Sequence, residues 1–284
     1  MSKAHTGTSP LWPAYLHHVE IGTPQPEAMR DFYAQSFGYT PRTLPDGGIH
    51  LSDGERDLLL RPGAARSSPL GAFVVESPAQ LEALRGHLSE QGVPLEPAPT
   101  PLLAEGAFAA RDPDGRAVAF GLPREERTGS DVVPGRLQHW VVATTDLAAT
   151  MAFYRDTLGF PVSDEVVDDT GRVTAAFFRS DPEHHSFAAF LSDSARLDHH
   201  SLDVPDWNRI RDWADHFAEL DVQICWGPGR HGVGNNLFFM VLDPDENMVE
   251  LSTELEHVPA EVPTRQWQHG RRALNLWGPA YFRV

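Results

Sequence analysis

Two stretches of this sequence decide the fold: YLHHVEIGTPQPEAMRDFYAQSFGY at residues 15–39 and RLQHWVVATTDLAATMAFYRDTLGF at residues 136–160. Each reads as a short apolar strand, a turn, a helix that carries Phe-Tyr, and then Phe-Gly-Tyr or Leu-Gly-Phe. The interval from histidine to tyrosine is the same in both, from His18 to Tyr33 and from His139 to Tyr154. An internal repeat of this kind predicts two homologous halves.

The ends of the two halves also match. RDPDGRAVAFGLP at residues 111–123 corresponds to LDPDENMVELSTE at residues 242–254, and in both an Asp-Pro-Asp turn separates two strands. Between the matching ends, each half holds further strands and one more helix, expected near residues 77–92 and 205–221. In the second of these helices, apolar residues recur at helical spacing. They are Trp207, Ile210, Trp213 and Phe217.

The order β-α-β-β-β in each half predicts an α+β protein with two tandem domains. We expect the domains at residues 1–125 and 126–258, joined by a polar linker rich in helix breakers near residues 121–136. The remaining tail, residues 259–284, is aromatic and does not match the repeat. It is expected to act as a lid over a site or as a subunit interface.

Charge and composition exclude several classes of function. Forty acidic residues against 23 basic ones give a formal charge of −17, which argues against nucleic-acid binding and against docking on anionic lipid. The single cysteine, Cys225, excludes an intramolecular disulfide and a cysteine-rich zinc site. No segment reads as a signal peptide or a membrane span, so a soluble cytoplasmic protein is expected. The 14 histidines stand out.

The histidines gather in the second half, where the repeat places three metal-binding side chains at defined positions. His139 and His199 each lie two residues after a leucine on a predicted strand, and Glu250 lies seven residues after Asp243. The matching positions of the first half are occupied by His18, Ala72 and Ala119. The second domain can therefore hold a metal that the first cannot, because two of the three first-half positions carry alanine.

Two imidazoles and one carboxylate suit a divalent iron or manganese ion, with coordination positions left open. Strand alternation supports convergence, since side chains two residues apart share one face. The two expected faces are Leu137, His139 and Val141 on one strand, and Met248, Glu250 and Ser252 on another. Ordinary packing or surface exposure is the alternative for any single strand histidine. The neighbouring His200 is expected to point to the opposite face from His199.

With these positions in place, the second half resembles the catalytic domain of type I extradiol (catechol 2,3-type) ring-cleavage dioxygenases. These belong to the vicinal oxygen chelate (glyoxalase/bleomycin-resistance/dioxygenase) superfamily. The resemblance covers roughly residues 12–258 and is weaker in the first half. It implies paired βαβββ modules in each domain, forming a curved, open mixed-sheet barrel. The motifs that carry it are LQHWVV, HHSFAAF, RLDHHSLDV, GPGRHGVGNN and LDPDENMVEL.

The resemblance implies an Fe(II) site, with Mn(II) as the alternative, held by His139, His199 and Glu250. It implies an enzyme that inserts both atoms of O2 to cleave the ring of a catechol-like diol in aromatic catabolism. His185 matches the family's acid–base histidine better than His184 does, and His231 matches a further histidine of the site. A homo-oligomer, a dimer or tetramer, is also implied.

One departure from the family concerns Met240. The family usually has a tyrosine ten residues before the carboxylate ligand, and a thioether cannot donate the hydrogen bond that the tyrosine gives to substrate. The substrate or its orientation is therefore expected to differ from that of catechol in the relatives.

Further residues are candidates for contact with substrate, and for each of them ordinary packing is the alternative. The candidate walls are Phe187, Trp226, Phe238 and Met240, and the candidate polar contacts are Asn235 and Asn236. In the tail, Arg271 and Arg272 are candidates for binding a substrate carboxylate. The competing role of the tail is a subunit interface built from Trp277, Tyr281 and Phe282.

Two other functions remain open from the sequence. The first is another metalloenzyme of the superfamily, either a hydroxyphenylpyruvate-type dioxygenase or an isomerase, although an isomerase needs a second glutamate that the matching positions do not show. The second is a metal-free small-molecule binding protein of the bleomycin-resistance type, against which the two histidines and the glutamate argue together.

Overall fold

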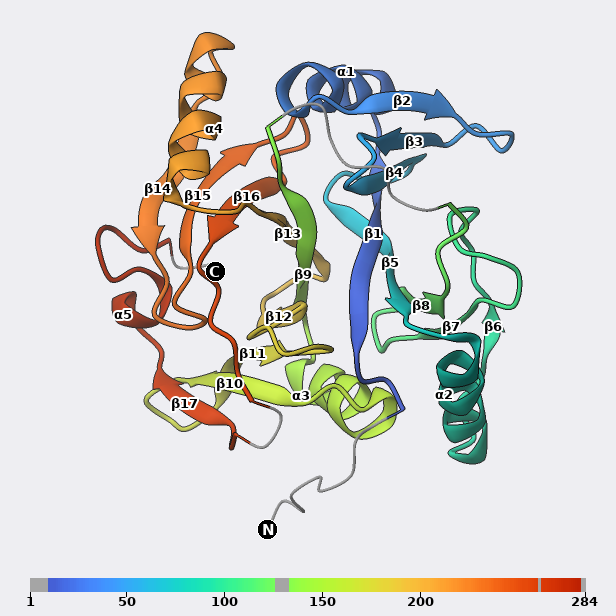
Figure 1. Ribbon diagram of the computed structural model, residues 1–284. Helices are drawn as coiled ribbons and strands as arrows, with labels where there is room; N and C mark the ends of the chain where they lie inside the picture. The colour runs from blue at the N-terminus through green and yellow to red at the C-terminus, as the bar shows by residue number, and fades with distance from the viewer. Residues whose placement is uncertain (1–9, 126–132, 260–261, 282–284) are drawn as a thin grey trace.

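The computed structural model describes residues 10–125, 133–259 and 262–281 and contains two mixed sheets (Figure 1). The first sheet has the strand order β2-β3-β4-β1-β5-β8-β7-β6, and the second has the order β14-β15-β16-β13-β9-β12-β11-β10-β17. Neither sheet closes on itself. The expected α+β fold of two tandem domains with curved, open mixed sheets is confirmed. The boundary expected after residue 125 falls outside the described residues and stays a prediction.

Each domain consists of two βαβββ modules, and in each module the first strand pairs in parallel with the last. In the first domain these parallel pairs are β1–β4 and β5–β8, and in the second they are β12–β9 and β13–β16. The first strands of the two modules pair with each other antiparallel at the centre of each sheet. The strands that open the modules therefore lie in the middle of each curved sheet.

The elements of the first domain are β1 (Ala14–Thr23), α1 (Pro26–Phe37), β2 (Thr40–Thr43), β3 (Ile49–Ser52), β4 (Asp57–Pro62), β5 (Ser67–Val75), α2 (Pro78–Glu90), β6 (Glu96–Pro97), β7 (Phe108–Arg111) and β8 (Ala117–Gly121). Those of the second domain are β9 (Arg136–Thr144), α3 (Leu147–Met151) with its π-helical continuation (Ala152–Leu158), β10 (Val162–Val167), β11 (Val173–Phe178), β12 (Phe187–Leu191), β13 (Arg196–Asp203), α4 (Trp207–Glu219), β14 (Ile224–Arg230), β15 (Leu237–Leu242) and β16 (Met248–Thr253). The tail adds β17 (Arg265–Gln268) and α5 (Arg271–Leu274).

The repeated aromatic–glycine motif ends the first helix of each domain. Gly38 and Gly159 take left-handed backbone conformations, with φ of 74° and 85°, and the amide of each bonds back to a carbonyl of the helix. A residue with a Cβ is strained there, which explains why glycine follows the same helical turn in both halves.

One continuous core joins the two domains and includes α1 and α4. Phe37 of α1 packs against Trp213 and Phe217 of α4, with ring centroids 5.5 and 5.2 Å apart. Trp140 of β9 covers Gly71 of the other domain, where a side chain would come within 2.3 Å of the indole. Trp207 was expected on the apolar face of α4. It is instead 42% exposed, because it is the first residue of the helix.

Strand alternation in β9 is interrupted near its start. Trp140 and Val142 point into the shared core, and Val141 belongs to a separate cluster on the other face of the strand. Leu137, expected beside His139 and Val141, lies in the core cluster with Trp140. The reason is a shift in register between β9 and β13, where Ser201 faces His139 but Leu202 faces Leu137.

Two tyrosines connect the domains in a nearly symmetric way. Tyr33 of α1 donates to Asp243 Oδ2 in the Asp-Pro-Asp turn of the second domain, at 3.0 Å. Tyr154, at the repeat-equivalent position, donates to Asp112 Oδ2 in the turn of the first domain, at 3.4 Å. Both hydroxyls and both carboxyls are buried. The two features by which the sequence reveals its repeat therefore meet across the domain interface.

Replacing Tyr33 by Phe is expected to lower the free energy of unfolding by about 1–2 kcal/mol at pH 8, and by less at pH 5. Burial raises the pKa of Asp243 to about 6, although hydrogen bonds from Asn247 and Tyr33 oppose this. Because this folded-state pKa lies above the unfolded value, the stabilising effect of the bound proton is lost as pH rises through about 6. The tyrosine donor favours the ionised carboxylate, so its removal matters most at pH 8.

Urea unfolding of the metal-free proteins at pH 5 and pH 8 measures this difference. Tyr154→Phe is the matched control, and a smaller loss is expected because its hydroxyl lies farther from Asp112. Equal losses at both pH values for Tyr33→Phe would contradict the assignment of the effect to the Asp243 carboxylate.

The tail lies against the second domain. Strand β17 pairs in parallel with β10 and extends the sheet by one edge strand, and α5 lies near β14 (Figure 1). Leu276 donates its amide to the carbonyl of Arg230, and the indole of Trp226 donates to the carbonyl of Pro279. Phe282, one of the expected interface residues, lies outside the described residues. Among the helices that the structure describes, none has the length and apolar character needed to cross a membrane.

Candidate metal centre

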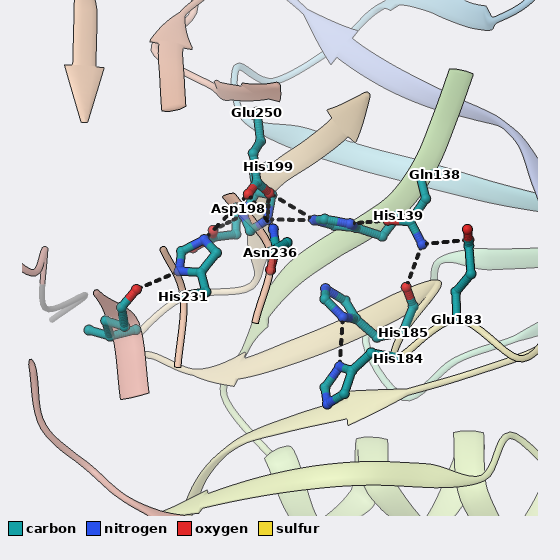
Figure 2. Close-up of polar contacts among 11 residues, drawn as sticks. Gln138, His139, Glu183, His184, His185, Asp198, His199, His231, Asn236 and Glu250 are labelled. Atoms are coloured by element: carbon teal, nitrogen blue, oxygen red, sulfur yellow. Dashed lines mark hydrogen bonds and ion pairs between the residues drawn. The ribbon is translucent and has the colours of Figure 1, made fainter. Parts of the chain in front are cut away.

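Three side chains from adjacent strands meet on the concave face of the second sheet. His139 lies on β9, His199 on β13 and Glu250 on β16, and these strands are neighbours in the order β16-β13-β9 (Figure 2). All three are buried. His139 Nε2 lies 2.9 Å from Glu250 Oε2 and 3.2 Å from His199 Nε2, and His199 Nε2 lies 3.3 Å from the same carboxylate oxygen.

Neighbouring side chains fix the orientation of both histidines. Gln138 donates through Nε2 to Glu183 and to the carbonyl of His185, so its Oε1 is the acceptor that faces Nδ1 of His139. Asp198 Oδ1 accepts from Nδ1 of His199 at 2.6 Å. With a proton on each Nδ1, the Nε2 lone pairs of both rings are directed toward Glu250. This is the second-sphere arrangement that orients histidines for metal binding.

The charge balance of the site favours a bound cation. Burial alone would raise the pKa of Glu250, but its close contacts with His139, His199 and His231 hold it well below its ordinary value. Burial lowers the pKa of His139, against the opposing effect of Glu250. Burial would also lower the pKa of His199, but hydrogen bonding to Asp198 and Glu250 outweighs burial and raises it. The donor set is thus one carboxylate beside two buried imidazoles.

The spacing of the donor atoms fits a single metal ion. Two ligands at right angles, each with a bond of about 2.1 Å to the ion, stand about 3 Å apart. The three separations between the donor atoms here are close to that value. Two histidines and one carboxylate on one side of an ion leave the other side open, as in mononuclear iron oxygenases.

The first domain offers no equivalent donor set at the matching positions. Ala72 and Ala119 belong to an apolar cluster, and Nε2 of His18 lies 2.7 Å from the hydroxyl of Thr100. Within the described ranges 10–125, 133–259 and 262–281, the three second-domain residues form the one group of three or more metal-binding side chains. His200 points away from the site, as expected, and its ring lies 6.0 Å from that of Tyr33.

A cavity of about 390 Å³, counted with its open mouth, lies over the three side chains. Its lining combines the three candidate ligands with two further histidines and mainly apolar side chains. The lining residues are His139, Val141, Phe177, His185, Phe190, His199, His231, Val233, Asn236, Met240, Glu250, Ala273 and Leu274. Such a lining suits a small ligand with an apolar body and a few polar atoms.

The two expected acid–base histidines both line this cavity. The ring of His185 lies 4.4 Å from that of His139, while its neighbour His184 is fully buried behind it and does not line the cavity. Burial lowers the pKa of His185 well below its ordinary value, with His139 and His184 adding to the effect. His185 is therefore a neutral base at neutral pH.

His231 is held by the tail. Its Nδ1 donates to the carbonyl of Leu274 in α5, and its ring stacks on Phe238 with centroids 3.7 Å apart. Its Nε2 lies 3.3 Å from Glu250 Oε1. Because a carbonyl can only accept, Nδ1 carries the proton and Nε2 faces the site.

The candidate substrate-binding residues divide into two groups. Met240 and Asn236 line the cavity, and the amide of Asn236 also donates to Glu250 Oε1 at 3.2 Å. The structure does not place the others at the cavity. These are Phe187, Trp226, Phe238, Asn235, Arg271 and Arg272.

For five of these six residues the structure gives a physical reason. Phe187 lies at a position of β12 that points into the core, where its ring stacks on that of Tyr154 with centroids 3.8 Å apart. Trp226 and Phe238 belong to a buried apolar cluster and pack against the ring of His231. Arg271 and Arg272 begin α5, whose cavity-facing residues are Ala273 and Leu274.

The fold and the site together define a class: repeated βαβββ modules that present two histidines and one carboxylate on the concave face of a sheet. The chain belongs to the Glyoxalase/Bleomycin resistance protein/Dioxygenase superfamily, whose family model matches residues 15–120 and 136–251.

Two relatives in sequence and one solved structure in fold are similar to this chain. Metapyrocatechase 2 of Cupriavidus necator is 37% identical over 153 residues, which cover 52% of this chain but only 46% of that relative. An iron-dependent extradiol dioxygenase of Rhodococcus jostii is 26% identical over 81% of this chain and 83% of its own length. In fold, the chain is similar to homoprotocatechuate 2,3-dioxygenase of Brevibacterium fuscum, with a TM-score of 0.79, 23% identity, and coverage of 98% and 93% of the two chains. The resemblance to extradiol dioxygenases indicated by the sequence motifs is confirmed.

Proposed function

We propose that this protein is an Fe(II)-dependent extradiol dioxygenase that inserts both atoms of O2 into a catechol-like diol and opens its ring. The observation that carries the proposal is the convergence of His139, His199 and Glu250 below a cavity that His185 and His231 also line. A metal-free binding protein has no need for three ligand atoms about 3 Å apart. Mn(II) is the alternative ion, because the same donor set accepts it.

A bound Fe(II) would supply open positions for the diol and for O2, and would lower the pKa of a coordinated hydroxyl. His185 accepts the proton of the diol at Nε2 and returns it later to an oxygen of the opening ring. His231 Nε2 accepts a hydrogen bond from the other hydroxyl of the diol. This contact holds the substrate ring in a fixed position relative to the candidate ligands. Val141, Phe177 and Phe190 cover the apolar face of the ring and exclude water.

The cavity favours a diol without an ionic substituent. Among its described lining residues, none is lysine or arginine, so a carboxylate on the substrate would be buried without a counter-charge. Met240 stands beside Glu250 across the β15–β16 ladder and offers a polarisable thioether without a donor. We therefore propose catechol and its alkyl-substituted forms as the substrate class.

Anaerobic purification with Fe(II), followed by O2 uptake and absorbance of the ring-opened product, tests the function. We expect about one O2 consumed per diol, and kcat/KM for 3-methylcatechol at least about tenfold above that for 3,4-dihydroxyphenylacetate. Full iron loading without O2 uptake for any diol would contradict the function. Preference for the carboxylated diol would contradict the substrate class alone. The homo-oligomer and the cytoplasmic location stay predictions.

A further inference from the structure

A row of buried side chains extends from His185 away from the cavity. Nδ1 of His185 lies 3.0 Å from Nδ1 of His184, and Nε2 of His184 lies 3.0 Å from Oδ2 of Asp164 on β10. Figure 2 shows the first of these contacts, with the two rings nearly perpendicular. The second is close in distance but does not have the geometry of a straight hydrogen bond. His184 and Asp164 have fully buried side chains and lie outside the cavity.

The far end of this row is held by the tail. Arg265 of β17 donates to Asp164 Oδ1 at 2.6 Å and to Oδ2 at 3.2 Å, and the indole of Trp267 donates to Oδ2 at 2.8 Å. Burial would raise the pKa of Asp164, but the close contact with His184 and the hydrogen bonds from Arg265 outweigh burial and lower it. Asp164 is therefore an ionised carboxylate. Arg265 also donates to the carboxylate of Glu256, through Nη1 and Nη2.

The position of each proton follows from the chemistry of the partners. An ionised carboxylate can only accept, so the ring nitrogen of His184 that faces Asp164 carries a proton. When the His184 ring carries this single proton, its Nδ1 is an acceptor, and the donor that the described residues place within hydrogen-bond distance of it is Nδ1–H of His185. A proton on Nδ1 leaves the lone pair of His185 on Nε2, the nitrogen on the side of the cavity.

We infer that Asp164 and His184 are positioning residues that hold His185 in the tautomer able to accept a substrate proton at Nε2. The inference rests on the proposed dioxygenase function, in which His185 is the acid–base group. No proton has to pass along the row, because the carboxylate acts by fixing where the protons of two neutral rings sit. The same logic assigns the buried aspartate of a Ser-His-Asp triad to control of the histidine tautomer.

The direct test is ¹⁵N NMR of the histidine rings in the metal-free protein, which needs no turnover. The His185 signals are assigned by their loss in His185→Ala. In the unmodified chain we expect the proton on Nδ1 of His185. In Asp164→Asn the new amide can donate a hydrogen bond to Nε2 of His184. The His184 proton then moves to Nδ1, and the His185 proton moves from Nδ1 toward Nε2. A proton already on Nε2 in the unmodified chain, or no change in Asp164→Asn, would overturn the inference.

Glu256→Gln is the matched control, since it weakens the hold on Arg265 and leaves in place the Glu256 carbonyl that accepts the backbone amide of His184. It is expected to leave the His185 tautomer unchanged. With iron loaded, we expect Asp164→Asn to lower kcat by about 100-fold or more, with iron content and KM within about twofold. Glu256→Gln is expected to stay within about threefold. An equal loss in the two variants would overturn the inference in favour of simple anchoring of the tail.

His184 provides a second pair of variants that does not depend on the tail. A glutamine there can donate its amide to Asp164 and accept from Nδ1 of His185, so His184→Gln is expected to keep the tautomer and to stay within about tenfold of the original kcat. His184→Leu can do neither and is expected to lose about 100-fold. Full activity in His184→Leu would overturn the inference. If no diol is turned over by any form, the proposed function fails, while the NMR result still decides the tautomer.

Discussion

Glu250→Gln is expected to lose its bound iron and, with it, all measurable ring cleavage. The carboxylate is the one anionic donor of the site, and its oxygens face His139, His199 and His231 at once. Loss of a residue that only orients a metal ligand lowers metal affinity by about 10- to 100-fold, so loss of a ligand is expected to exceed about 100-fold. The fold should persist, because glutamine keeps the shape and removes a buried charge.

Metal analysis after anaerobic reconstitution, together with O2 uptake, measures this effect. Glu254→Gln is the matched control, since that carboxylate lies four residues along the same segment, half-exposed and paired with Arg230 at the surface. It should bind iron as the unmodified chain does. Stoichiometric iron in Glu250→Gln would show that the carboxylate is not a ligand.

The three candidate ligands could be chosen from sequence because the repeat supplies an internal comparison. His139 and His199 stand at equivalent positions of two modules, and Glu250 stands at the equivalent of Ala119. A repeat predicts which strands are central, and side chains on the same face of neighbouring central strands lie close together. The α+β class and the tandem arrangement follow from the same pattern.

The walls of the cavity could not be chosen in this way, because they depend on strand parity and on distant segments. In β12, Phe187 faces the core and Phe190 faces the cavity, and a shift of one residue in the expected strand would exchange the two. Ala273 and Leu274 reach the cavity through the tail, which has no counterpart in the repeat. The sequence suggested Arg271 and Arg272 for substrate binding, but they begin the short helix α5, and the residues after them line the cavity.

The residues that orient the histidines were missed for a different reason. Gln138 and Asp198 each precede a candidate ligand, and in an ideal strand adjacent side chains point to opposite faces. Both strands have register shifts at this point, so each neighbour turns toward the ring of the histidine that follows it. A signal was present in the sequence, since a polar residue directly before the ligand occurs in both modules, but alternation argued against using it.

His185→Gln is expected to retain iron and to lose about 10²- to 10⁴-fold in kcat, the range for removal of one general acid–base group. His185 lines the cavity but is not one of the three converging donors, and its ring faces that of His139 rather than a shared ion. Glutamine fills most of the same space and can still donate a hydrogen bond, but it cannot take up and return a proton at neutral pH.

Iron content decides between this role and its alternatives. His87→Gln, on α2 of the first domain, is the control for a histidine change remote from the site and should leave both iron and turnover unchanged. If His185→Gln lost iron and activity in proportion, His185 would support the metal through its packing on His139. If it kept full turnover, the proton would have to be taken by His231, the other cavity-lining histidine that is not a candidate metal ligand. Retained iron with a large fall in kcat and little change in KM is the result that only an acid–base role produces.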